Sequence, residues 1–148
     1  MRSQGEIEAA VCDGVVRFQS EYMGRGPRDI HAHLVGTLVV VRSQDALTPA
    51  ERRLVETVNG NGLTGGGHAL TGGDGASEAG GFTGGRLLLK RLRSHLVALA
   101  RPRLAEVVEG VTGVRVVSLH HDISTLTGEE VLVFSLAAAP ACRRRRGD

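Results

Sequence analysis

The sequence predicts an α+β fold with elements in the order α-β-β-α-α-β-β, in which helices pack on a four-stranded antiparallel sheet. The first observation is a pair of strand patterns joined by a short turn, found once at residues 29–41 and again at 114–136. The second is the helical spacing of apolar residues in the segments before and between these hairpins. Strands joined by short turns pair antiparallel, so the two hairpins supply all four strands.

The first predicted helix begins at a capping box. Ser3 and Glu6 have the S-x-x-E spacing that satisfies two free amide groups at a helix start. The helix has one apolar stripe, formed by Ile7, Val11, Val15, Phe18 and Tyr22. Gly24, Gly26 and Pro27 should end it, because glycine adopts the left-handed cap and proline cannot continue the hydrogen-bond ladder.

The first hairpin and the second helix follow. Residues 29–35 alternate as a strand, Gly36 and Thr37 form the turn, and residues 38–41 are an apolar, β-branched run typical of a buried strand. Thr48 then caps a short helix in which Pro49 takes the first position and Glu51 completes a second capping box.

Residues 59–85 interrupt the domain with a glycine-rich insert. Glycine makes up 12 of these 27 residues. Ordering glycine costs much backbone entropy, so we expect a disordered loop. Residues 1–142 are otherwise predicted to be one domain, followed by a basic, disordered tail at 143–148.

A third helical segment is predicted from Arg86 to about Val111. Its apolar stripe is read as Leu88, Leu92, Leu96, Leu99, Leu104, Val107 and Val108. Pro102 interrupts the pattern, because a proline inside a helix removes a hydrogen bond and clashes one turn back. Either the helix kinks near Ala100, or a second helix begins at Pro102.

Charge and cysteine content restrict the class of protein. The formal net charge is +2, but four arginines, Arg143 to Arg146, lie in the tail. The body is therefore close to neutral, and we expect no specific nucleic-acid partner. Cys12 and Cys142 are expected to be reduced thiols of a cytoplasmic protein. The sequence shows neither a signal peptide nor a transmembrane segment.

Histidines suggest a metal site. His31 and His33 share one face of a predicted strand, and His120 and Asp122 share one face of another. If these strands were neighbours, the four side chains could bind a zinc or other transition-metal ion, and a metal-dependent enzyme is the alternative function. The competing interpretation is a set of polar residues on an open sheet face. We predict no cofactor, and a transition metal remains the alternative.

The turn Gly24-Arg25-Gly26-Pro27-Arg28 is a second candidate site. Successive amides around glycines can form a nest for a small anion, and the two arginines add positive charge. The competing interpretation is a helix C-cap followed by a rigid turn, with both arginines solvated or paired to carboxylates. The carbonyl end of a helix repels anions, which favours the second interpretation.

Four blocks of the sequence together resemble the MpsC-like family of bacteria. They read GEIEAAVCDGVVRFQSEYMGRGPRDIHAHLVGTLVVVR, LTPAERRLVE, LARPRLAEVVEGVTGVRVVSLHHDIS and TGEEVLVFSL. The family is a domain of unknown function named for a sodium-translocating, membrane-potential-generating system. The glycine-rich insert and the arginine tail depart from its pattern. The resemblance points to Gly24, Arg25, Gly26, Pro27, Asp122 and Gly128 as residues of interest.

The resemblance implies a small accessory or regulatory protein beside a membrane ion or inorganic-carbon transport system. No catalytic signature is present, so we favour a non-enzymatic role in which the protein binds a partner or a small anion. The partner would be a membrane transport protein. A single layer of helices over a small sheet leaves apolar surface uncovered, so we also expect a homodimer.

Overall fold

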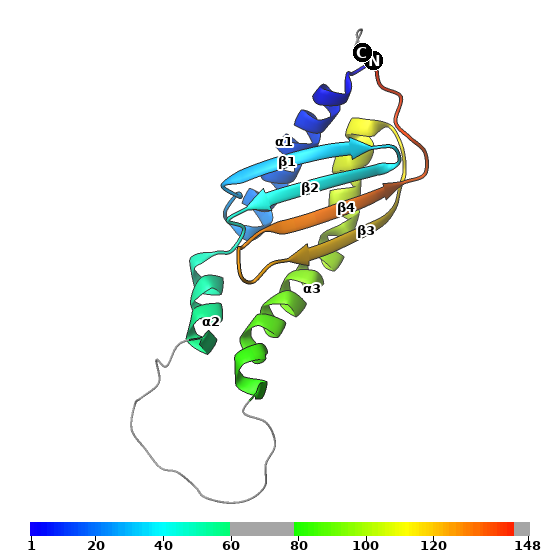
Figure 1. Cartoon of the computed structure of the whole chain (residues 1–148). Coiled ribbons are helices and arrows are strands. Elements are labelled where there is room, and N and C mark those ends of the chain that lie inside the picture. The colour runs from blue at the N-terminus through cyan, green and yellow to red at the C-terminus, as the bar shows by residue number, and fades with distance from the viewer. Residues whose placement is uncertain (60–78, 144–148) are drawn as a thin grey trace, which may run out of the picture.

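The computed structural model describes residues 1–59 and 79–143 of the chain. The elements in chain order are α1 (Gln4–Met23), β1 (Asp29–Val35), β2 (Leu38–Gln44), α2 (Pro49–Asn59), α3 (Ala79–Thr112), β3 (Val116–Ile123) and β4 (Glu130–Leu136) (Figure 1). This order confirms the α+β prediction and both hairpins.

The sheet is antiparallel throughout, with strand order β1-β2-β4-β3. β1 pairs with β2, and β3 pairs with β4, as the hairpins predict. The second strand of the first hairpin, β2, then pairs with the second strand of the other, β4. The first strand of each hairpin is therefore an edge strand, and the two edges lie on opposite sides of the sheet.

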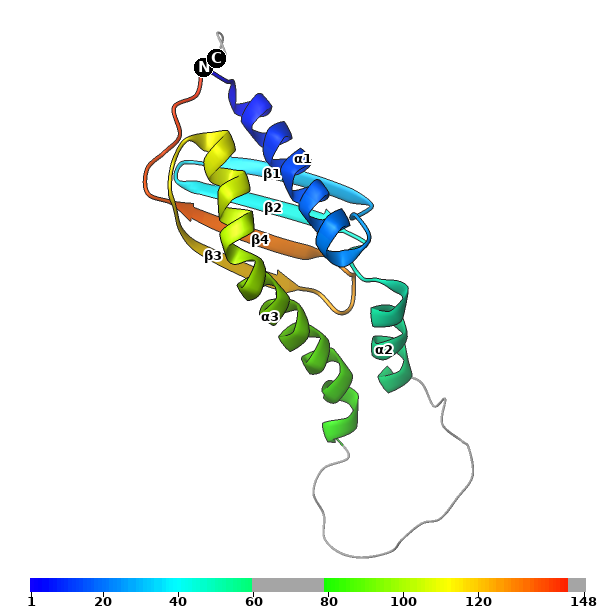
Figure 2. The same ribbon diagram turned by 180° about the vertical axis from the view of Figure 1, so that it is seen from behind.

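Helices α1 and α3 cover one face of the sheet and leave the other face open (Figure 2). The core between the layers contains mainly branched aliphatic side chains, with Phe134 at 0% exposure on β4. Strand alternation explains this, because residues two apart point to the same face. Helix α2 lies beside the first half of α3 and away from the sheet, and a smaller cluster of Leu47, Val55, Leu89 and Ile123 packs where they meet.

Both predicted capping boxes are present. The Ser3 amide donates to Glu6 Oε2 at 2.6 Å, and the Glu6 amide donates to Ser3 Oγ at 3.3 Å. At the start of α2, the Thr48 amide donates to Glu51 Oε1 at 3.0 Å and the Glu51 amide donates to Thr48 Oγ1 at 3.3 Å. Local sequence alone therefore defines these two helix starts.

Helix α3 differs from its prediction in two ways. It is one helix with Pro102 inside it, so the two-helix alternative is wrong. It also begins at Ala79, within the predicted insert, because extending a formed helix costs far less than starting a new one. The rest of the insert, residues 60–78, and the tail at 144–148 lie outside the described residues. Arg143, the first tail residue, pairs through its backbone with Arg2.

The apolar face of α3 is also rotated from the predicted stripe. Leu104 and Val108 are buried as expected, but Leu88, Leu92 and Leu99 are exposed. The buried face contains Leu89, Arg93, Ala100, Leu104 and Val108. A buried arginine on this face requires buried partners, and these are described below.

Side chains from the helices cover part of each sheet edge. On β1, the Leu34 amide donates to Glu8 Oε1 at 2.9 Å, and its carbonyl accepts from Gln4 Nε2 at 3.0 Å. On β3, the Val117 carbonyl accepts from Arg101 at 3.1 Å. Such contacts occupy backbone groups that would otherwise pair with another strand.

Candidate functional site

The candidate turn Gly24–Arg28 lies at one end of the sheet, against the β2–α2 loop. Gly24 ends α1 with φ of 74°, a conformation that favours glycine. Arg25 pairs with Asp45 at 3.1 Å and also donates to the Leu47 carbonyl at 3.5 Å. Arg25 is therefore paired to a carboxylate, which agrees with the rigid-turn interpretation. The carboxylate belongs to Asp45, in the loop before α2.

Gly128 belongs to the same end of the sheet. It lies in the β3–β4 turn with φ of 75°, and its carbonyl accepts from the Ala46 amide at 3.1 Å. Asp45 has a positive φ of 54° and also pairs with Arg52 of α2. The turn after α1, the loop before α2 and the β3–β4 turn therefore hold one another together.

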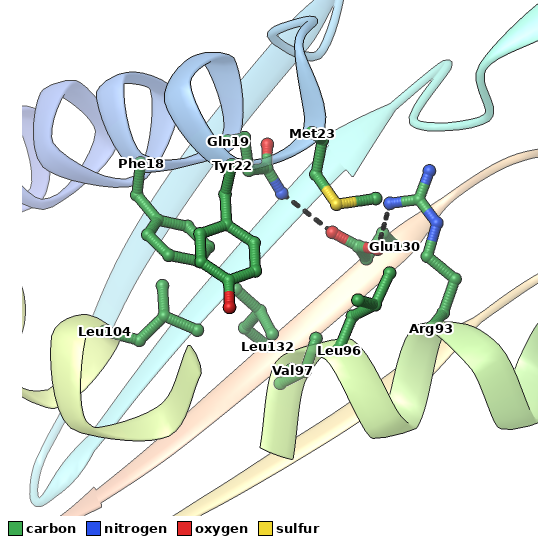
Figure 3. A pocket seen from close by; sticks show the side chains of 10 residues that line it. All are labelled: Phe18, Gln19, Tyr22, Met23, Arg93, Leu96, Val97, Leu104, Glu130 and Leu132. Atoms are coloured by element: carbon green, nitrogen blue, oxygen red, sulfur yellow. Dashed lines mark hydrogen bonds and ion pairs between the residues drawn. The ribbon is translucent and has the colours of Figure 1, made fainter. Parts of the chain in front are cut away.

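A buried network of charged and polar side chains lies beneath this junction. Arg93 of α3 donates to both Glu51 oxygens at 2.7 Å, to Glu130 Oε2 at 3.1 Å and to the Ala46 carbonyl. Gln19 of α1 donates to Glu130 Oε1 at 2.7 Å, as Figure 3 shows. His121 of β3 lies 3.1 Å from Glu130 Oε2. All three helices and two strands meet in this network.

Burying this network costs free energy that its own contacts must offset. Arg93 and Glu130 are only 3% and 2% exposed. Moving charges out of water costs several kcal/mol per ion, and only close, fully hydrogen-bonded pairing offsets that cost. The sequence does contain a sign of this network. Glu130 lies two and four residues before the buried Leu132 and Phe134, so it shares their face of β4. None of the residues predicted as site candidates belongs to this network.

Two opposing effects act on the pKa of Glu51. Burial raises the pKa of its carboxyl, but hydrogen bonds from Arg93 and Thr48 more than offset this and hold the pKa below its ordinary value of 4.5. Above pH 4.5 the carboxylate therefore stabilises the folded state.

This predicts loss of stability in acid. As pH falls below 4.5, the unfolded chain binds a proton at Glu51 before the folded chain does, so the contribution is lost as pH passes the folded pKa. We expect the free energy of unfolding to fall between about pH 5 and about pH 3, and to fall less steeply in Glu51→Gln. Urea unfolding at a series of pH values measures both slopes, and equal slopes would contradict the prediction.

An apolar pocket adjoins the network between α1, α3 and β4 (Figure 3). Its walls are mostly apolar, and Gln19, Arg93 and Glu130 form its polar side. The space open to the centre of a water molecule is about 20 Å³, enough for one water. Among the residues that the structure describes, Gln19 Oε1 is buried without a hydrogen-bond partner, which such a water could supply.

The four candidate metal ligands do not converge within one chain. His31 and His33 lie on β1, His120 and Asp122 on β3, and two strands separate them. Three strand spacings amount to about 14 Å, far more than one ion can bridge. Within residues 1–59 and 79–143, no three His, Cys, Asp or Glu side chains are grouped to hold a metal. Asp122 instead pairs with Lys90 of α3 at 3.1 Å.

A further surface, absent from the sequence predictions, lies on α3. Leu88, Leu92 and Leu99 are 55%, 47% and 60% exposed. Arg91 and Arg103 are exposed, and their i+3 and i+4 spacing to Leu88 and Leu99 places them beside these leucines. We call these five residues the basic leucine face.

The segment of α3 that carries this face is positively charged, and the nearest acidic residue along the helix is the exposed Glu106, one turn after Arg103. Residues 86–103 contain six basic residues and no acidic one. Of these, Arg93 is buried in the network and Lys90 pairs with Asp122. None of the helices within the described ranges is both long enough and apolar enough to span a bilayer.

Comparison with known proteins supports the resemblance noted above. The chain is 28% identical over 135 residues to the uncharacterized protein YbcI of Bacillus subtilis (strain 168), covering 91% of this chain and 89% of that protein. No solved structure matches. The family described as "Na+-translocating membrane potential-generating system (MpsC)" matches residues 3–65 and 80–138, and the gap between them falls in the glycine-rich insert. The chain therefore belongs to the MpsC family.

Proposed function

We propose that the protein is a non-enzymatic accessory or regulatory protein of a membrane-potential-generating ion transport system. It works at the cytoplasmic surface of the membrane and contacts the anionic lipid headgroups there through the basic leucine face. The observation that carries this proposal is the set of exposed leucines within a segment of α3 that has no acidic residue. The family description supplies the membrane system.

The leucines supply the apolar part of this contact. Removing a leucine side chain fully from water is worth about 1.5–3 kcal/mol, and three of them stand about half-exposed on one side of α3. An interfacial helix buries such residues at the boundary between headgroups and acyl chains. The first part of α3 projects past the sheet beside α2 (Figure 1), and Leu88 and Leu92 in this part are exposed although Leu89 is buried.

The positive charge of the basic leucine face determines which kind of surface it can bind. Each basic residue near an anionic bilayer contributes about 1 kcal/mol of attraction. A second copy meeting the same face would bring two segments of like charge together, which is unfavourable. An anionic surface is therefore a better match for this face than another copy of it. Anion binding at Gly24–Arg28 stays a separate prediction.

Co-sedimentation with lipid vesicles tests the proposal. We expect the full chain to bind vesicles containing phosphatidylserine and phosphatidylcholine, and to bind pure phosphatidylcholine vesicles at least about tenfold less. The double variant Arg91→Gln/Arg103→Gln should lose about thirtyfold in partitioning, since two basic residues contribute about 2 kcal/mol. The triple variant Leu88→Gln/Leu92→Gln/Leu99→Gln should lose at least about tenfold.

Leu126→Gln is the matched control, because Leu126 is 78% exposed but lies on the β3–β4 turn. It should bind vesicles like the unaltered chain. Equal binding to both vesicle types, or no effect of the α3 substitutions, would overturn the proposal. Capture of an acidic protein without any vesicle binding would also overturn it.

A further inference from the structure

The open face of the sheet presents the two candidate ligand pairs in matched rows. Strand register places His33, Val40, Val133 and His120 across one row. The next row is His31, Arg42, Val131 and Asp122. Each row therefore begins with a ligand from β1 and ends with a ligand from β3, and a valine from β4 lies between them.

We propose that two copies of the chain pack through this face and hold zinc ions between them, each bound by His31 and His33 of one copy and by His120 and Asp122 of the other. The half-site on each edge is incomplete within one chain and is completed by the second copy.

Symmetry brings the half-sites together. Homodimers are usually two-fold symmetric, and packed sheets keep their strands within about 30° of parallel. A two-fold axis between the sheets and parallel to the strands exchanges the two edges but preserves position along the strands. β1 then lies opposite β3 of the partner, so His33 faces the partner subunit's His120 and His31 faces the partner subunit's Asp122.

The distance between two packed sheets suits a zinc site shared by two copies. Packed sheets lie about 10 Å apart, a gap that side chains from both sides can bridge. Three imidazoles and a carboxylate form a tetrahedral zinc set with no open position, as in structural sites. The ion would therefore join two copies without supplying a catalytic centre, which agrees with an accessory protein.

The alternative symmetry fits less well. An axis perpendicular to the strands would place β1 against β1, so imidazoles would face imidazoles and Asp122 would lie at the other edge. The parallel axis puts an anionic carboxylate opposite an imidazole pair instead. It also stacks Val40 on the partner subunit's Val133, giving the interface an apolar centre.

Two existing contacts orient the ligands. His31 Nε2 lies 3.1 Å from Asp29 Oδ1, and His120 Nε2 lies 3.3 Å from Ser118 Oγ. A hydrogen bond at one ring nitrogen leaves the other free for metal, the arrangement found around metal-bound histidines. Asp122 accepts from the Ile123 amide at 2.8 Å and from Lys90 Nζ at 3.1 Å, both at Oδ1, which fixes the carboxylate and leaves Oδ2 for the metal.

Zinc titration with mass measured by sedimentation equilibrium tests the inference on the full chain. We expect about one zinc ion per chain and a doubling of mass on zinc addition. His31→Ala/His33→Ala and His120→Ala/Asp122→Ala should each lose both. All four residues are exposed, so neither variant should affect folding, which circular dichroism checks. His95→Ala, an exposed histidine on α3, should behave like the unaltered chain.

Mixing the two double variants tests whether the site is shared. Because neither variant should dimerise alone, zinc should assemble only mixed dimers, each with one complete site and one empty site. A one-to-one mixture should therefore recover about half of the zinc uptake. Recovery of none would overturn the inference. So would zinc uptake by a monomer, a dimer that forms equally well with a chelator, or full uptake by either variant alone.

Discussion

Replacing Arg93 by alanine is expected to lower the free energy of unfolding by about 3–5 kcal/mol. The substitution removes the guanidinium from the buried Glu130, which keeps its contacts with Gln19 and His121, and it frees Glu51 from both of its hydrogen bonds to Arg93. An uncompensated buried charge is the main source of the loss. Equilibrium unfolding in urea measures it.

Arg91→Ala is the matched control, because Arg91 is an exposed arginine two residues away on the same helix. It should change stability by no more than about 0.5 kcal/mol. Adding Glu130→Ala to Arg93→Ala should cost less than the sum of the two single changes, because the double variant leaves fewer unpaired charges. Similar losses for Arg91 and Arg93, or strict additivity, would show that the network is not energetically coupled.

Replacing Phe134 by alanine is expected to cost about 3–5 kcal/mol, because it removes a large side chain and leaves a cavity. Phe134 is fully buried on β4, and its strand neighbours in register, Val39 and Leu119, also point toward the helices. Thermal or urea unfolding provides the measurement. The pocket beside Glu130 should gain little from this cavity, since Phe134 is not among its lining residues.

Ser135→Ala is the control, because Ser135 is the next residue of β4 and points to the open face. Its substitution should change stability by no more than about 0.5 kcal/mol. A loss as large as that of Phe134→Ala would mean that the open face carries as much of the folding energy as the helix-covered face.

The sequence by itself determined the elements of this protein. Helix starts at Ser3 and Thr48 depend on groups three residues apart, so short-range sequence contains the full signal. The hairpins are equally local, because alternation and turn residues specify a strand and its neighbour in the chain. These features, together with the family blocks, were sufficient for the α+β fold and the family.

Tertiary structure decided which faces and edges these elements present. The pairing of β2 with β4 separates the two histidine pairs, and no local pattern specifies contacts between distant hairpins. Helix α3 has apolar residues on two sides, so its spacing fits more than one rotation. Arg93 selects one of them, because its charge must reach Glu51 and Glu130. The same rotation points Leu88, Leu92 and Leu99 away from the core, so these three side chains are exposed.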